Sequence, residues 1–124
     1  MVLQLYFGQV LVGTVMDPFY SDETWGGSFN QAVSSETGQR ERLYKFIAFC
    51  KGWHVRLDAS ENPDASEFAQ FGDLLKSDLW YTMSGDARRL VLDGAPVFYD
   101  DQISWRTFVK PRGWGVLSDL VFDE

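Results

Sequence analysis

The stretch VLQLYFGQVLVGTVM, residues 2–16, decides the fold of this chain. It contains two apolar runs, Val2 to Phe7 and Val10 to Met16, with Gly8-Gln9 between them. A two-residue connection that begins with glycine suits a type II′ turn, because glycine adopts positive φ without strain. The stretch therefore predicts an antiparallel hairpin. We expect the hairpin to end at Asp17-Pro18, since proline has no N–H to donate to a strand ladder.

A third strand and a helix are expected after the hairpin. The strand covers Trp25 to Phe29, where two glycines allow a bulge or a close backbone approach. Beyond Ser35 the apolar residues recur at i, i+3, i+4 and i+7, which places them on one helix face. These residues are Leu43, Phe46, Ile47 and Cys50. Gly52 is a C-terminal stop signal, so we expect this helix to end there and a strand to run from Trp53 to Leu57.

The last elements are a second helix and further strands. Asn62-Pro63-Asp64 predicts a helix start, because asparagine caps, proline suits the first turn and an acid favours the positive end of the helix dipole. Arg88–Leu92 and Val97–Tyr99 flank a turn over residues 93–96. Apolar residues then alternate from Ile103 to Val109, which is typical of a strand with one buried face.

This order of elements predicts an α+β fold, a mostly antiparallel sheet with about two helices packed on one side. The chain has 124 residues and no room for a second core of useful size, so we expect a single domain over residues 1–124. Hydrophobic residues make up 45% and charged residues 23% of the chain. Both values lie near the globular average and indicate an ordered protein.

The first quarter of the chain carries a resemblance. The segments Gly8-Gln9-Val10-Leu11-Val12-Gly13-Thr14-Val15 and Trp25-Gly26-Gly27-Ser28-Phe29 resemble the start of small, uncharacterised bacterial α+β proteins. In that group a Gly-x-x-x-Gly-x-Val/Ile hairpin precedes a Trp-x-Gly-x-Phe strand, and this chain approximates the pattern. The resemblance implies a fold and a bacterial setting, and it carries no catalytic residue across.

The charge of the chain indicates which partners to expect. The net charge is −7, and residues 59–86 hold six acids against Lys76 alone, a net charge of −5. Nucleic-acid binding neutralises phosphates with basic side chains, so we expect no nucleic-acid partner. The acidic stretch favours a basic protein partner instead. No apolar run reaches the roughly 20 residues of a membrane span, so we expect no membrane association.

Cysteine and histidine usage points away from nucleophilic and metal chemistry. The single cysteine, Cys50, fits a reducing cytoplasm, and the single histidine, His54, excludes a two-histidine metal site. Because Cys50 completes an apolar helix face, we interpret both residues as structural. Residues 58–69 resemble a calcium loop but carry Pro63 and Ala69 where that loop needs glycine and glutamate. We therefore expect no metal and no cofactor.

Carboxylates supply one alternative function. A small enzyme that uses carboxylates for acid–base chemistry would draw on Asp17, Asp22, Asp100 or Asp101. Adjacent residues on a strand point to opposite faces, however, and Asp pairs are common in turns. The sequence thus favours a non-catalytic role.

Aromatic residues make up 16% of the chain, including five tryptophans. They build either a core of large rings or an exposed recognition patch, because large indoles usually keep one edge wet. Trp, Tyr and Arg are the residues typical of interface anchors. The predicted partner-binding residues are Trp80, Tyr81, Tyr99, Trp105 and Arg106.

The resulting hypothesis is a non-catalytic protein-interaction module of the inhibitor or immunity type. The alternatives are the carboxylate enzyme and a carbohydrate-binding module that stacks sugars on the same aromatic rings. The sequence favours no particular oligomeric state.

Overall fold

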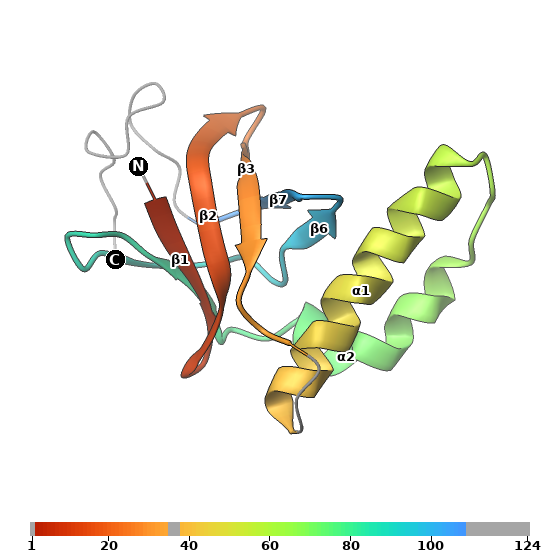
Figure 1. Cartoon of the computed structure of the whole chain (residues 1–124), viewed down its shortest axis with the longest axis horizontal. Coiled ribbons are helices and arrows are strands. Elements are labelled where there is room, and N and C mark those ends of the chain that lie inside the picture. Colours follow the sequence, from red (N-terminus) through yellow and green to blue (C-terminus); the bar gives the residue numbers. More distant parts are fainter. Residues whose placement is uncertain (1, 35–37, 109–124) are drawn as a thin grey trace.

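The protein forms a seven-stranded antiparallel sheet with its helices on one side, as the sequence predicts (Figure 1). The computed structural model describes residues 2–34 and 38–108. The strands are β1 (Val2–Phe7), β2 (Val10–Ser21), β3 (Thr24–Gln31), β4 (Trp80–Met83), β5 (Arg89–Val91), β6 (Val97–Tyr99) and β7 (Gln102–Trp105). The helical segments are α1 (Gln39–Asp58), the 3-10 helix η1 (Ala65–Phe71) and α2 (Gly72–Leu75). The strand order across the sheet is β5-β4-β1-β2-β3-β7-β6.

The β1–β2 hairpin turns where the sequence predicts. Phe7 pairs with Val10, and Gly8 between them has a φ of 60°. Gln9 does not adopt positive φ, so the turn has the glycine-first conformation of type II′.

Strand β2 does not end at Asp17-Pro18, so that expectation is wrong. The register of β2 against β3 shifts between Met16 and Phe19, and pairing resumes as far as Ser21. Asp17 has a φ of 50° within this bulge. The bulge leaves the proline outside the regular ladder, where its missing N–H removes no strand hydrogen bond.

Helix α1 buries the predicted face but runs beyond the predicted end. Leu43, Phe46, Ile47 and Cys50 are all buried. Gly52 lies within the helix, so the expected stop there and the expected strand Trp53–Leu57 are both wrong. A glycine ends a helix when it takes a left-handed conformation, and Gly52 does not take one.

Two arginines of α1 hold the η1–α2 segment against the helix. Arg56 donates two hydrogen bonds of 3.1 Å to the Glu67 carboxylate. Arg42 pairs with Asp73 and also donates to the Gln70 carbonyl at 2.6 Å. These guanidinium groups lower the pKa of Glu67 and of Asp73. The segment begins where the sequence predicts, although Asp64, not Asn62, caps it by accepting a hydrogen bond from the Ser66 N–H.

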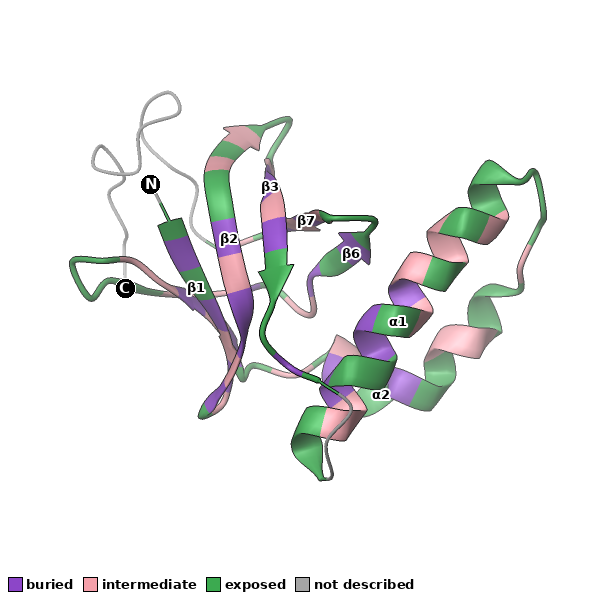
Figure 2. Cartoon of the chain, in the orientation of Figure 1, coloured by how far each residue is buried: buried purple, intermediate pink, exposed green. Residues whose placement is uncertain are grey.

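The inner face of the sheet and α1 form the core. Buried residues alternate with more exposed ones along β1 (Figure 2), and the same pattern in β2 is interrupted at Val12-Gly13, where its register against β1 shifts. The fully enclosed aliphatic and phenylalanine side chains include Leu5, Val12, Val15, Phe98, Ile103, Leu43, Phe46 and Ile47.

The two strands beside the predicted turn at residues 93–96 do not pair with each other. They lie at opposite edges of the sheet, β5 against β4 and β6 against β7. The sheet nevertheless curls, because Leu92 forms a bridge with Thr107 and the Asp93 N–H donates to the Arg106 carbonyl. In the described ranges no helix is both long and apolar enough to cross a bilayer.

Candidate functional site

The tryptophans predicted to bind a partner are buried. Trp80 has no exposed surface, and its Nε1–H donates to the Leu74 carbonyl at 2.8 Å. Trp105 is 3% exposed and stacks on Trp25, with 5.9 Å between the ring centroids. The expectation that Trp80 and Trp105 are surface anchors is therefore wrong. Strand alternation turns both rings to the inner face of the sheet, where large apolar surface is removed from water.

The other three predicted residues reach the surface at separate places. Tyr81 is half-buried on β4, Tyr99 is 40% exposed on β6, and Arg106 is exposed just past β7. Strands β1, β2, β3 and β7 lie between β4 and β6 in the sheet. Tyr99 is therefore remote from Tyr81 along the sheet, whereas Arg106 lies beside the end of β5, because the Asp93 N–H donates to the Arg106 carbonyl.

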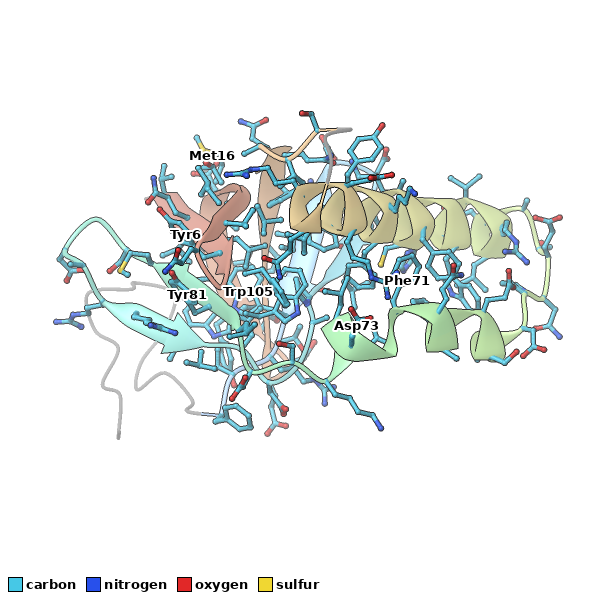
Figure 3. The ribbon with its side chains drawn as sticks, turned by 90° about the horizontal axis from the view of Figure 1, so that it is seen from below. Tyr6, Met16, Phe71, Asp73, Tyr81 and Trp105 are labelled. Atoms are coloured by element: carbon cyan, nitrogen blue, oxygen red, sulfur yellow. The ribbon has the colours of Figure 1, made fainter. Side chains whose placement is uncertain are left out.

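By strand register Tyr81 and Tyr99 lie on the same face of the sheet, the one opposite the core, although the Tyr99 ring also lies 5.4 Å from the ring of His54 on α1. We call this side of the sheet the outer face. It is defined by strand register, and its side chains are those of Val2, Gln4, Tyr6, Leu11, Thr14, Met16, Phe19, Ser28, Asn30, Tyr81, Met83, Arg89, Val91, Val97, Tyr99, Gln102 and Ser104. None of these residues is buried. Tyr6 and Tyr81 lie side by side at the strand end of the molecule, away from both helices (Figure 3). Met16 lies further along the same face, because it pairs with Val2, four residues before Tyr6 on β1.

The outer face is almost without charge. Arg89 is its one charged residue, although the whole chain has a net charge of −7. Acids occupy the bulge and two of the turns at the borders of the face instead: Asp17, Asp22, Glu23, Asp100 and Asp101. Asp86, in a third turn, forms an ion pair with Arg88. The result is an uncharged surface, rich in Tyr and Met, with an acidic rim.

Three side chains of the outer face form an ordered stack. The rings of Tyr6 and Tyr81 lie 5.2 Å apart with an interplanar angle of 8°. The guanidinium of Arg89 lies 4.0 Å from the centroid of Tyr81, which is a cation–π contact. The Tyr81 hydroxyl donates to the Gly8 carbonyl at 3.0 Å and so fixes the middle of the stack. We call these three residues the Arg89–Tyr81–Tyr6 stack.

Sequence reasoning found Tyr81 but missed its two partners in the stack. Tyr6 and Arg89 are 75 and 8 positions away from Tyr81, and only strand pairing brings them together. The available signal was the alternation within β1, which places Tyr6 opposite to Leu5.

In comparisons with known proteins, no family model matches the chain, and no curated protein or solved structure is similar enough to count as a match. The resemblance of the first quarter to small bacterial α+β proteins therefore remains a prediction. Its glycines have structural environments here, since a side chain at Gly13 or Gly27 would meet neighbouring backbone atoms.

The carboxylates of the alternative enzyme hypothesis are dispersed. Asp22 lies in the turn between β2 and β3, whereas Asp100 and Asp101 lie in the turn between β6 and β7. The Asp101 carbonyl accepts a hydrogen bond from the Phe29 N–H, so the two turns flank opposite ends of β3. Asp22 is therefore separated from the Asp100–Asp101 turn by the length of β3, and Asp17 lies in the bulge of β2. Within the described part of the chain, no three acidic, histidine or cysteine side chains converge to hold a metal ion.

Cys50 and His54 lie on the same helix face with structural contacts. His54 Nδ1 lies 2.9 Å from the Cys50 carbonyl, and since a carbonyl only accepts, Nδ1 is the donor. Cys50 is 3% exposed, and burial raises the pKa of its thiol to about 11. A thiol with that pKa holds almost no thiolate at neutral pH, which is the nucleophilic form.

We therefore expect Cys50 to react slowly in the native protein. At pH 7.5, a soluble disulfide reagent should label native Cys50 at least 100-fold more slowly than the thiol of the unfolded chain, because both burial and the raised pKa suppress reaction. The rate is measured by absorbance with and without denaturant. Equal rates in the two states would contradict the buried position of Cys50.

Proposed function

We propose that this protein is a non-catalytic protein-interaction module of the inhibitor or immunity type, and that the outer face of its sheet binds the partner. The observation that carries the proposal is the composition of that face. Interface centres are depleted in charged residues and enriched in aromatic residues, Met and Arg. The outer face has Tyr6, Tyr81, Tyr99, Met16 and Met83 with the single charge of Arg89.

The acidic rim supports a basic protein as the partner. Acids at the edge of an uncharged patch attract a surface whose own apolar centre is bordered by Lys and Arg, and this complementarity steers association. A second copy of the chain fits less well, because face-to-face packing would bring two acidic rims together. A bacterial, cytoplasmic setting is part of the proposal. Its supports are the single buried cysteine and the resemblance of the first quarter.

The carbohydrate-binding alternative receives less support from the exposed aromatics. A sugar-binding platform needs a free ring face. Tyr81 has Tyr6 against one face and Arg89 over its ring, and Trp25, Trp80 and Trp105 are buried. The stack is therefore better suited to present ring edges and a guanidinium to a protein surface.

Replacing Met16 by lysine tests the proposal. Met16 is 37% exposed, so Met16→Lys is expected to leave the unfolding midpoint nearly unchanged. In a complex the same change places an unpaired charge in the interface centre, and we expect the dissociation constant to rise at least tenfold. The wild-type protein is used to capture a partner from cells that express the chain, and the purified pair is measured by calorimetry at several salt concentrations.

Val55→Lys is the matched control. Val55 is 66% exposed on α1, outside the outer face, and its replacement makes the same chemical change. We expect Val55→Lys to bind within twofold of wild type and the affinity of both to fall as salt rises. Equal dissociation constants for Met16→Lys and Val55→Lys would show that the outer face is not the binding surface.

A further inference from the structure

Arg89 differs from the other arginines whose pairing the structure shows. Arg42, Arg56 and Arg88 each form an ion pair with a carboxylate of the same chain. Among the described residues no carboxylate pairs with Arg89. Its guanidinium instead makes a cation–π contact with the ring of Tyr81. It is exposed and belongs to a face that carries no acid.

We infer that Arg89, held on the Arg89–Tyr81–Tyr6 stack, is the subsite that receives an Asp or Glu side chain of the protein partner. This inference rests on the proposed function and adds a charged contact at the β5 edge of the outer face. The partner surface then has a carboxylate opposite this edge and basic residues opposite the acidic rim.

The stack makes Arg89 suitable for this task. A guanidinium presents its N–H donors in one plane and binds a carboxylate through two hydrogen bonds. Contact of its face with Tyr81 leaves the N–H groups at its edge available and restricts the long side chain before binding. Tyr6 supports Tyr81 from the other side, and the Tyr81 hydroxyl is anchored on the Gly8 carbonyl.

The surroundings favour an acid at this point. An arginine covered by a partner that offers no acid would carry an uncompensated charge, so such a partner would lose affinity. No acid of the outer face itself competes for Arg89 or repels the incoming carboxylate. A broad sheet face binds a folded protein surface, and the carboxylates on such a surface are mainly Asp and Glu side chains. We therefore expect a side chain, and not a chain terminus, to meet Arg89.

The first test uses a displayed library as the probe, so that it does not depend on the natural partner. The library is a small helical scaffold with a randomised face. Binders are first selected on the wild-type protein, and those that also bind Met16→Lys are then discarded. The remaining binders are those that depend on the outer face. We expect an Asp or Glu to be enriched at one position, and Arg89→Gln to weaken these binders about tenfold. Arg89→Lys keeps the charge but loses the planar pair of donors, so its affinity for these binders should lie between those of the wild type and of Arg89→Gln. Outer-face binders that show no preference for an acid, or that bind Arg89→Gln within twofold of wild type, would overturn the inference.

The second test uses the natural partner captured through the outer face. Arg89→Lys places an amine at position 89, and carbodiimide treatment of the complex should couple it to an Asp or Glu of the partner, identified by mass spectrometry of the linked peptides. Lys45 on α1 and Lys76 after α2 are internal controls, since their amines lie outside the outer face. A complex that still depends on Met16 but yields no link at position 89 overturns the carboxylate subsite and leaves the proposed function intact. A complex that does not depend on Met16 overturns the proposed function itself.

Discussion

Trp80→Ala is expected to lower the free energy of unfolding by about 3–5 kcal/mol, as truncation of a fully buried tryptophan does in other cores. Trp80 packs edge-on against Phe7, with 4.9 Å between ring centroids, and lies 6.2 Å from Phe46 of α1. It thus joins the sheet to the helix. Its removal leaves a cavity between the two layers and deprives the Leu74 carbonyl of its hydrogen bond. Chemical denaturation followed by circular dichroism measures the change.

Trp105→Phe and Trp80→Phe form a matched pair that separates ring packing from hydrogen bonding. The Nε1–H groups of Trp105 and Trp25 are buried and have no hydrogen-bond partner among residues 2–34 and 38–108, whereas the Nε1–H of Trp80 has one. Trp80→Phe should therefore destabilise the protein by about 1 kcal/mol more than Trp105→Phe. If Trp80→Ala were as stable as the wild type but no longer bound the partner, Trp80 would be a surface anchor, which would contradict its buried position.

Gly13→Ala is expected to lower the free energy of unfolding by about 3 kcal/mol. A Cβ at Gly13 would overlap the Phe29 ring and the backbone oxygen of Asn30 on the neighbouring strand. A ring can rotate away, but the carbonyl of a paired strand cannot move without loss of the β2–β3 register. The measurement is again the denaturation midpoint, with the slope of the transition as a check on the compactness of the unfolded state.

Gly52→Ala is the control for this change and should have the opposite sign. No atom lies within 4 Å of a Cβ at Gly52, which lies inside α1. Alanine there restricts the unfolded chain and improves helix propensity, so stability should rise by about 0.5–1 kcal/mol. Equal and small effects at both glycines would show that the contact between β2 and β3 is looser than the structure has it.

Much of the fold follows from local sequence patterns. The glycine of the first turn and the helical spacing from Leu43 to Cys50 predict what the structure has. The alternation expected from Ile103 to Val109 is confirmed only as far as Trp105, where β7 ends, and Val109 lies outside the described residues. Each of these signals lies within a few neighbouring residues, and backbone geometry alone sets its period. The signals that failed, Asp17-Pro18 and Gly52, mark places where a bulge or a continued helix is supported by distant contacts.

The candidate surface depended on information that local patterns do not contain. Alternation assigns Trp80 and Tyr81 to opposite faces, but it does not say which face is covered by α1. Packing of Phe46 against Trp80 decides that Trp80 lies inside and Tyr81 outside. The sequence predicts both Trp80 and Tyr81 as partner-binding residues because both side chains are common at interfaces. Trp80 is buried, so only Tyr81 is available to a partner.

The sequence by itself determined the α+β class, the first hairpin, the buried face of α1 and the acidic net charge. Periodicity, turn chemistry and composition are properties of the chain before it folds. The tertiary structure alone decided that Trp25, Trp80 and Trp105 pack inward, and that Arg89, Tyr81 and Tyr6 stack on one face of the sheet. The reason is physical: strand pairing joins β5, β4 and β1 across long sequence separations, and burial against the helix selects which side of that sheet remains in water.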